Sequence, residues 1–206
     1  MDIALVADKG GVGKTTLSYH IATRLRQLGH DVGLIDLDHR AASSSWVADA
    51  ETPFFAAYPY DQLTAGPPEH EVRVWDTPAH PNADLLRSLA AGCELLLIVA
   101  EPDLESQRAA AEMWLELDRI GCKRVRLLLN NVSPTGNEGA NALANARGAG
   151  LPTLQTVVRR YACYQHCRWD GRAVCDYPYS SADKAWGDIC ALVAECLATM
   201  EDNHAA

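Results

Sequence analysis

The sequence has no long apolar run, no internal repeat and no low-complexity tract. Because a membrane-spanning helix needs about 18 consecutive apolar residues, we expect no such helix. Basic residues are also outnumbered: 18 Lys and Arg stand against 27 Asp and Glu, giving a net charge of −9. This balance argues against a protein coated in basic surface. It leaves room for a local basic patch, because salt screens charges beyond about 10 Å.

Signals for export and cross-linking are missing as well. The chain runs from Met1 directly into a glycine-rich loop, so we expect no signal peptide and no DNA-binding extension before that loop. The seven cysteines are odd in number and irregular in spacing, which argues against a disulfide framework. We therefore predict a cytoplasmic protein. With 206 residues, 48% of them hydrophobic, the chain has the length for one domain spanning 1–206.

Short apolar runs alternate with helical patterns along the chain. The apolar runs predict strands at 3–7, 31–36, 72–76, 95–100, 125–130 and 153–157. Amphipathic spacing predicts helices at 14–28, 105–120 and 182–200. This alternation indicates a doubly wound α/β fold with about six to eight mainly parallel strands. The stretch 50–70 contains four prolines and is expected to be a surface excursion.

A glycine-rich segment follows the first predicted strand and reads Lys9-Gly10-Gly11-Val12-Gly13-Lys14-Thr15-Thr16. Glycines let the backbone curl around phosphates, and the next helix turns the positive end of its dipole toward them. In such a loop Lys14 reaches the β- and γ-phosphates and the Thr15 hydroxyl ligates Mg²⁺. Asp8 stands where the usual pattern has glycine. The nucleotide-binding residues are predicted to be Gly10, Gly11, Val12, Gly13, Lys14, Thr15 and Thr16.

The segment from Lys9 to Thr16 resembles the deviant Walker motif of the ParA/MinD ATPases. The resemblance implies ATP and Mg²⁺ as cofactors and a sandwich homodimer that closes around two nucleotides. Lys9 matches the signature lysine of that family and would cross to the nucleotide of the partner subunit. Such a contact stabilises the dimer only while triphosphate is bound. Lys9 and Lys14 are therefore candidate catalytic residues.

Three carboxylates follow two of the predicted strands. By the resemblance, Asp36 supports the Mg²⁺ shell and Asp38 orients or activates the attacking water. Asp76 ends a strand of the Walker B form and would hold Mg²⁺ through water. The residues His39-Arg40 replace the Pro-Gln that is common in the family. An alternative interpretation is that Asp36 and Asp38 only end a strand and cap a helix.

The resemblance continues more weakly along the rest of the chain. The residues after Asp76, from Thr77 to His80, are candidates for sensing the γ-phosphate. Asn130 ends a strand that is similar to the one whose asparagine recognises adenine in the family. The segments 156–160 and 171–177 are similar to the late region of short ParA proteins. Coverage is nearly complete, but the motifs after Ala79 are much less specific.

The favoured function is a ParA-like positioning ATPase that binds nucleoid DNA without sequence specificity when dimeric. Such binding needs clustered Lys or Arg on the phosphate backbone. The resemblance also implies a ParB-like or adaptor protein that stimulates hydrolysis, and a cargo such as a plasmid, a chromosome region or a carboxysome. The candidate DNA contacts are Arg159, Arg160, Arg168 and Arg172, with a second group at Lys123, Arg124 and Arg126. Each of these residues can instead pair with the abundant Asp and Glu.

Other members of the same superfamily supply the alternatives. A MinD-like membrane switch needs a basic amphipathic tail, whereas residues 198–206 are acidic and polar, so we expect no stable membrane association. A metal-cluster protein is suggested by Cys163, Cys167 and Cys175 with His166, but no C-x-x-C motif is present. We expect these cysteines to pack as small apolar residues, as do Cys190 and Cys196. A ligase of the dethiobiotin synthetase type and a bacterial tyrosine kinase are disfavoured, since neither a substrate motif nor a tyrosine-rich tail is found.

Overall fold

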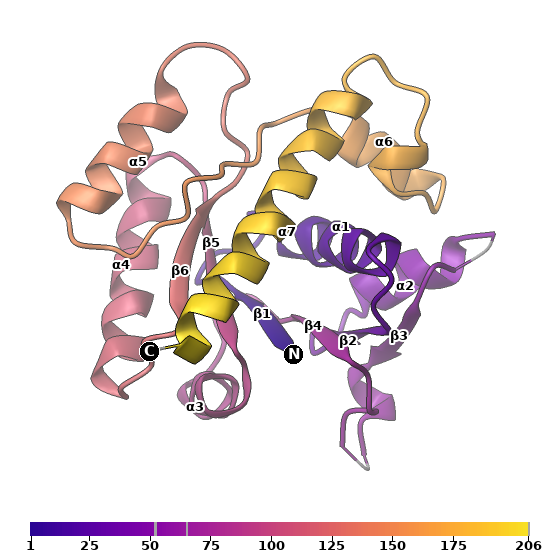
Figure 1. Ribbon diagram of the computed structural model, residues 1–206, viewed down its shortest axis with the longest axis horizontal. Helices are drawn as coiled ribbons and strands as arrows, with labels where there is room; N and C mark the ends of the chain where they lie inside the picture. Colours follow the sequence, from indigo (N-terminus) through magenta and orange to yellow (C-terminus); the bar gives the residue numbers. More distant parts are fainter. Residues whose placement is uncertain (52, 65, 206) are drawn as a thin grey trace.

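The computed structural model describes residues 1–51, 53–64 and 66–205. Six parallel strands form one sheet in the order β3-β2-β4-β1-β5-β6, which confirms the doubly wound α/β fold (Figure 1). The strands are β1 (Asp2–Val6), β2 (Val32–Asp36), β3 (Ala56–Pro59), β4 (Val72–Asp76), β5 (Leu95–Ala100) and β6 (Val125–Leu129). The helices are α1 (Lys14–Gln27), α2 (Ala42–Asp49), α3 (Ala83–Gly92), α4 (Leu104–Arg119), α5 (Glu138–Gly148), α6 (Cys163–Trp169) and α7 (Ala182–Ala205), with short 3₁₀ turns η1 (Tyr60–Gln62) and η2 (Val174–Asp176).

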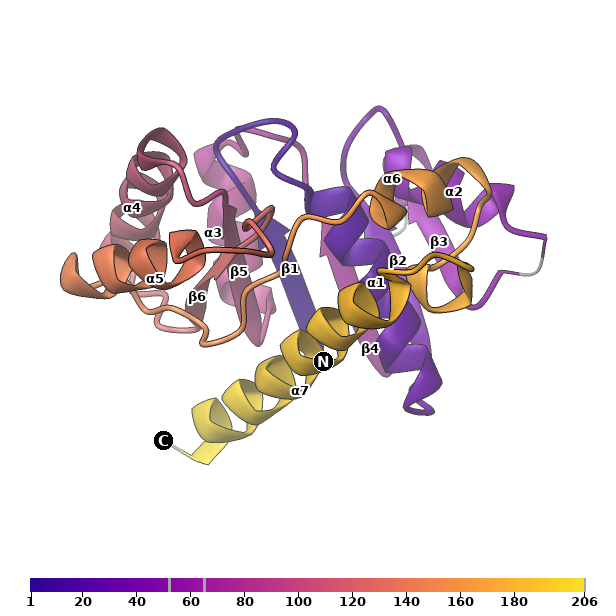
Figure 2. The ribbon, with the colours of Figure 1, turned by 90° about the horizontal axis from the view of Figure 1, so that it is seen from above.

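The sheet is buried on both faces, and successive residues of its central strands alternate between two cores. In β1, Ile3 and Leu5 pack with α1, α2, α6 and α7, whereas Ala4 and Val6 pack with α3, α4 and α5. Helix α7 runs diagonally across one face beside α1, and α3 and α4 lie on the other face (Figures 1 and 2). Within the described ranges, no helix has the length and apolar character needed to cross a bilayer.

Strand register brings the polar strand ends together at one edge of the sheet. Asp36 of β2 pairs with Asp76 of β4, and Leu5 of β1 also pairs with Asp76. The carboxyl end of β5 at Ala100 lies beside Leu129 of β6. Because all six strands are parallel, the residues that follow them meet at this edge, which is where doubly wound sheets bind ligands.

One strand lies where the sequence predicts only a surface excursion. β3 pairs with β2 from Gly33 to Asp36 and forms the edge of the sheet. Its side chains are exposed or half-buried, so the apolar pattern that marks the other strands is missing. Pro59 ends the strand, in keeping with the restriction of proline to sheet edges.

The predicted strand at 153–157 is wrong, although this segment does run beside β6. It makes an isolated bridge from Thr153 to Leu127, and Leu154 donates its N–H to the Leu127 carbonyl. The next two N–H groups, of Gln155 and Thr156, donate instead to the Glu195 carboxylate of α7, at 2.6 and 2.8 Å. A side chain of α7 thus replaces the sheet ladder, and regular pairing is lost.

Candidate functional site

The loop between β1 and α1 is shaped to receive an anion. Gly11 and Gly13 have φ angles of 82° and 94°, in the left-handed region that favours glycine. In the part of the chain that the structure describes, the N–H groups of Gly10 to Gly13 donate to no protein acceptor. Helix α1 begins directly after Gly13 with no acidic residue in its first turn. Free N–H groups and a helix N-terminus together fit a chain of phosphates.

Asn130 supports this loop from the end of β6. Its side-chain amide donates to the Val12 carbonyl at 2.7 Å, and the residue is 6% exposed. A Cβ atom at Gly13 would lie 2.3 Å from the Asn130 Nδ2, so only glycine fits at this position. The contact places Asn130 at the site, while its role in recognising adenine stays a prediction.

Asp76 lies buried beneath the loop and contacts the first turn of α1. Its Oδ2 accepts a hydrogen bond from the Thr15 hydroxyl at 2.9 Å, and its Oδ1 accepts one from Ser18 at 3.4 Å. Burial raises the pKa of Asp76 to about 6, and the neighbouring charge of Asp36 adds to that shift. Hydroxyl and carboxylate oxygens are the ligands that Mg²⁺ prefers, so the residues present fit this ion.

Asp36 is fully buried and caps a helix. Its Oδ2 accepts the N–H groups of Ser43 and Ser44, in the first turn of α2, at 3.1 and 2.9 Å. Its Oδ1 accepts the N–H of Asp38 at 3.1 Å. The half-buried Asp38 carboxylate in turn accepts the N–H of Arg40 at 3.0 Å. Helix capping is therefore part of what this pair does, and the roles in the Mg²⁺ shell and with water stay predictions.

Lys14 is the buried cation of the site, with 7% of its surface exposed. Burial lowers the pKa of Lys14, and the nearby carboxylates of Asp76 and Asp38 oppose that shift. The lysine thus sits at the start of α1 with a positive charge that the protein only partly compensates. This arrangement suits a side chain that binds phosphate oxygens.

Lys9 differs from Lys14 in its surroundings. Its side chain is 44% exposed, and its Nζ lies 3.6 Å from the Glu101 Oε2. Glu101 follows β5, and its other oxygen accepts a hydrogen bond from the Asn131 amide at 2.9 Å. Lys9 is therefore held at the edge of the site by an ion pair within its own chain.

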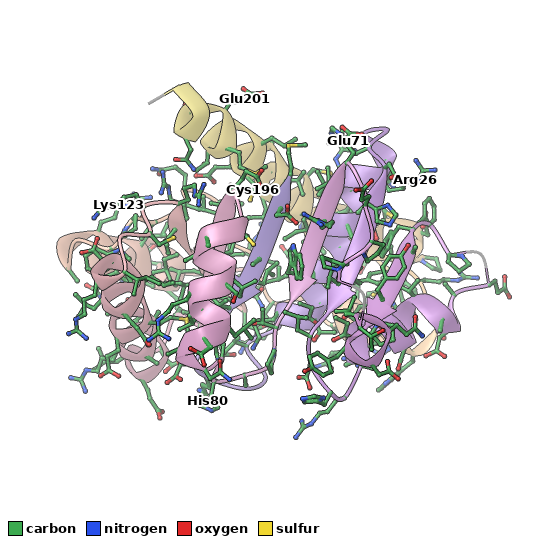
Figure 3. All side chains as sticks on the ribbon, turned by 90° about the horizontal axis from the view of Figure 1, so that it is seen from below. Arg26, Glu71, His80, Lys123, Cys196 and Glu201 are labelled. Carbon is green, nitrogen blue, oxygen red and sulfur yellow. The ribbon has the colours of Figure 1, made fainter. Side chains whose placement is uncertain are left out.

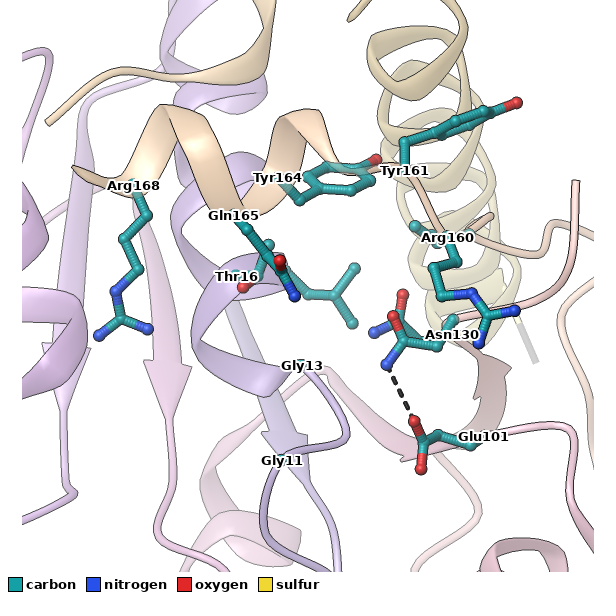
Figure 4. Close-up of a pocket in the computed structure, with 13 residues that line it drawn as sticks. Gly11, Gly13, Thr16, Glu101, Asn130, Arg160, Tyr161, Tyr164, Gln165 and Arg168 are labelled. Atoms are coloured by element: carbon teal, nitrogen blue, oxygen red, sulfur yellow. Dashed lines mark hydrogen bonds between the residues drawn. The ribbon is translucent and has the colours of Figure 1, made fainter. Parts of the chain in front are cut away.

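A cavity of about 280 Å³ opens beside the loop (Figure 4). Glu101, Gln165 and Tyr164 point into it, with Arg160 and Arg168 on opposite sides. Its wall is built from the phosphate loop, the ends of β5 and β6, and the segment around α6. The lining residues are Gly11, Gly13, Thr16, Leu17, Glu101, Asn130, Asn131, Val158, Arg160, Tyr161, Tyr164, Gln165 and Arg168.

The four arginines predicted to bind DNA have different environments. Arg159 makes a bidentate ion pair with Asp188 of α7, with N–O distances of 2.6 and 3.0 Å, and this contact raises its pKa. Arg160 and Arg168 line the cavity beside the phosphate loop. Arg172 is exposed and lines a different hollow with Glu51 and Asp176. The four arginines are close in sequence but do not form one basic face. Their contact with DNA stays a prediction.

The second basic group lies at the opposite end of the sheet, as the positions of Lys123 and His80 in Figure 3 show. Lys123 and Arg124 line a surface hollow of about 450 Å³ between the ends of α3 and α4, and Arg87 joins them there. Lys123 pairs with Asp118, and Arg124 donates to the Ala90 carbonyl at 2.9 Å. The sequence indicated Lys123 and Arg124 but not Arg87, which comes from a different helix.

The segment after Asp76 is tied to the phosphate loop. The Thr77 hydroxyl donates to the Leu5 carbonyl at 2.7 Å, and the His80 N–H donates to the Ala7 carbonyl at 3.1 Å. The His80 ring contacts Asp8 at 2.9 Å. Asp8, which departs from the usual loop pattern, therefore contacts the predicted γ-phosphate sensor.

Sequence reasoning missed several residues of the site. Ser18 contacts Asp76 one turn after Thr15, and helical spacing could have revealed it. Glu101 and Asn131 carried no such signal, because their place at the site depends on the order of the strands.

Most of the cysteines pack as small apolar residues, as the sequence predicts, whereas Cys175 and Cys190 are only half-buried. All seven are free thiols, and Cys163, Cys167 and Cys196 are fully buried in the core that contains α1 and α7. Burial raises the pKa of Cys167 to about 12, which disfavours the thiolate that metals and electrophiles require. The Cys167 sulfur lies 4.0 Å from the ring of the buried His20.

Comparison with known proteins agrees with this geometry. Residues 3–165 match the model of the CobQ/CobB/MinD/ParA nucleotide binding domain. The chain is 31% identical over 185 residues to the maintenance of carboxysome distribution protein A of Halothiobacillus neapolitanus, covering 84% of this chain and 85% of that protein.

Solved structures share the fold at low sequence identity. The Aquifex aeolicus cell division protein MinD superposes with a TM-score of 0.73 at 18% identity, covering 94% of this chain and 96% of that one. An ATP complex of Cyanothece McdA gives a TM-score of 0.73 at 15% identity, covering 96% of each chain. The match over residues 3–165, together with the phosphate loop and its buried carboxylates, shows that this chain belongs to the CobQ/CobB/MinD/ParA nucleotide-binding family.

Proposed function

We propose that this protein is an ATPase that pairs with a second copy of itself on binding ATP, holds DNA without sequence specificity, and positions a cellular cargo. The proposal rests on three features that occur together. The phosphate loop has free N–H groups, Lys14 is buried, and the Thr15 hydroxyl donates a hydrogen bond to Asp76 at 2.9 Å. These groups neutralise and position phosphates, which is most of what phosphoryl transfer asks of a protein.

Each part of the loop has a defined task in this proposal. The N–H groups from Gly10 to Gly13 and the Lys14 amine bind the β- and γ-phosphates. Thr15 and Asp76 hold Mg²⁺, which when bound neutralises the charge that develops on the phosphate oxygens. Asp38, two residues after the end of β2, orients the attacking water. Its carboxylate is half-buried, and its charge acts on Lys14 against the effect of burial on the lysine pKa, which supports this assignment.

Lys9 supplies the link between ATP and pairing. It stands next to the phosphate loop with a side chain that is 44% exposed, so once its ion pair with Glu101 breaks it can contact a second molecule that docks against this end of the sheet. A cation on the partner's triphosphate adds attraction that diphosphate lacks. Pairing would therefore follow the nucleotide state.

The surface that meets DNA is proposed from the exposed cations. Arg172 is the exposed member of the first group that lies outside the cavity. Lys123 and Arg124 of the second group share a surface hollow with Arg87. Pairing doubles either surface, and contacts to phosphates need no base recognition. A net charge of −9 makes such binding weak and sensitive to salt.

The cargo is proposed from the relative in Halothiobacillus neapolitanus, whose name assigns it to carboxysome distribution. We propose that this chain likewise distributes carboxysomes or a similar protein-bounded cargo along the nucleoid, together with an adaptor protein that stimulates hydrolysis. Repeated local release from DNA gives a gradient that cargo can follow.

Binding to random-sequence duplex DNA, measured at rising salt with ATP, ADP or no nucleotide, tests the proposal. We expect binding with ATP alone and a steep loss as salt rises. The double variant Lys123→Glu/Arg124→Glu and the single variant Arg172→Glu serve as matched charge reversals that tell the two surfaces apart. If no nucleotide state binds DNA while ATP still pairs the subunits, the DNA part of the proposal is wrong.

A further inference from the structure

Glu101 places a carboxylate beside the loop that is proposed to bind phosphates. It lines the 280 Å³ cavity beside the phosphate loop, with 27% of its side chain exposed (Figure 4). A carboxylate near bound phosphates weakens their binding by repulsion unless a cation accompanies it. Phosphate binding alone therefore does not explain why a carboxylate stands at this position.

The surroundings of Glu101 fix it in one position. Its N–H donates to the Ser106 hydroxyl at 2.8 Å, which ties the end of β5 to the first turn of α4. The Asn131 amide donates to its Oε1 at 2.9 Å. Asn131 itself has a φ of 57°, a left-handed conformation that asparagine tolerates better than most residues. Two elements thus direct the remaining oxygen, Oε2, toward Lys9.

The Lys9 Nζ lies 3.6 Å from the Glu101 Oε2. This distance is within ion-pair range but longer than that of a strong charge-assisted hydrogen bond. The lysine is 44% exposed, so water competes for it and the contact is weak enough to break. Glu101 is the better-fixed partner and Lys9 the movable one.

We propose that Glu101 is a positioning residue that holds Lys9 within its own chain and thereby raises the ATP concentration at which two subunits pair. The proposal rests on the proposed function of Lys9 as the residue that crosses to the partner's nucleotide. For Lys9 to cross, the ion pair must break, and Glu101 is left facing the cavity without its cation. Each subunit carries one such ion pair, so two ion pairs must break for each dimer that forms.

The test compares Glu101→Gln with wild type by measuring the dimer dissociation constant across an ATP titration with light scattering. Glutamine keeps the shape and the contact with Asn131 but removes the charge. Because a partly exposed ion pair is weak and two are broken, we expect pairing to tighten by about three- to tenfold. Glu105→Gln is the matched control, since it removes an equal charge in the first turn of α4. Unchanged or weaker pairing in Glu101→Gln would overturn the proposal.

Two further measurements separate this idea from simple repulsion and from failure of the proposed function. Because Lys9 accompanies Glu101 in the unpaired subunit, Glu101→Gln should change the ATP affinity of the monomer far less than it changes the dimer dissociation constant; an equal change in both would assign the effect to repulsion and overturn the proposal. Glu101→Asp should behave more like wild type than Glu101→Gln does. Acetylation of Lys9 in the nucleotide-free protein, followed by peptide mass spectrometry, should rise in Glu101→Gln. That readout does not depend on pairing, so unchanged Lys9 reactivity overturns the proposal even if wild type never pairs.

Discussion

Two lysines flank the same loop and are held in opposite ways. Lys14 is 7% exposed and lies at the start of α1, close to the buried carboxylate of Asp76 and the half-buried one of Asp38. Lys9 is 44% exposed and is held by one ion pair to Glu101. The environment of Lys14 is fixed by strand ends and by the first turn of a helix. The environment of Lys9 depends on a single contact that water can replace.

This difference explains how one loop can bind phosphates and also control pairing of the subunits. Groups that must be ready for phosphate chemistry are buried and preorganised, so that little reorganisation is needed when substrate arrives. A group that must move between subunits is exposed and weakly paired. Substitutions around Lys14 should therefore change chemistry, and substitutions around Lys9 should change pairing.

The largest effect is expected for Lys14→Ala. Loss of the buried cation should lower ATP hydrolysis by about 10²–10³-fold and weaken ATP binding, because Lys14 holds its charge in a buried position at the start of α1. Steady-state hydrolysis and titration with a fluorescent ATP analogue measure the two effects. Circular dichroism serves as the control for folding. Hydrolysis within a few-fold of wild type would remove Lys14 from the mechanism.

Asp38→Ala should separate hydrolysis from pairing. Loss of the carboxylate that orients water should slow hydrolysis by at least about 100-fold. Pairing on ATP should persist and last longer, because the triphosphate is no longer consumed. Phosphate release and light scattering over time measure these outcomes together. Wild-type hydrolysis in this variant would show that Asp38 has another role.

Asp76→Asn should act through the metal. We expect the Mg²⁺ concentration needed for hydrolysis to rise by about 10- to 100-fold. The same variant should unfold at a higher temperature in Mg²⁺-free buffer, because burial disfavours the charged form of Asp76. Mg²⁺ titrations of hydrolysis and thermal unfolding without metal measure the two effects. An unchanged Mg²⁺ requirement would contradict the placement of the ion.

The effect expected at His20, which joins α1 to the segment around α6, is on stability and leaves the phosphate chemistry aside. Its ring bonds the Thr16 carbonyl at 2.7 Å and accepts the Val174 N–H at 3.1 Å, and burial lowers its pKa from 6.5 to about 4. The unfolded chain therefore binds a proton at a higher pH than the folded one does. As pH falls from about 6.5 to 4, the free energy of unfolding should drop by roughly 3 kcal/mol through this residue.

Urea unfolding of wild type and His20→Asn at pH 7 and pH 4.5 measures this effect. The variant should be less stable at neutral pH and should lose less stability on acidification. His166→Asn, a half-buried histidine on α6, is the control and should keep the wild-type slope. An equal slope in His20→Asn and wild type would show that His20 does not couple stability to pH.

The parts of the site that were predictable are local in sequence. The loop from Lys9 to Thr16 carries its glycines, its lysines and its hydroxyl within one segment, and β1 and α1 on either side are equally clear. Asp36 and Asp76 were found because each ends a buried apolar strand, and parallel strands bring such ends together.

The rest depends on contacts between distant segments. Glu101 reaches Lys9 only because β5 lies next to β1. Asp188 of α7 neutralises Arg159, which therefore offers no unpaired charge to DNA. Glu195 of the same helix takes the N–H groups that a strand at 153–157 would have used. No pattern within the segments concerned reveals these partners.

Lys9 is proposed to couple ATP binding to pairing, and the molecular mass in solution is the sharpest test of this role. Light scattering should give twice the monomer mass for wild type with ATP and the monomer mass with ADP. Lys9→Ala should bind ATP with near wild-type affinity and remain monomeric. A Lys9→Ala protein that pairs on ATP as wild type does would contradict the account.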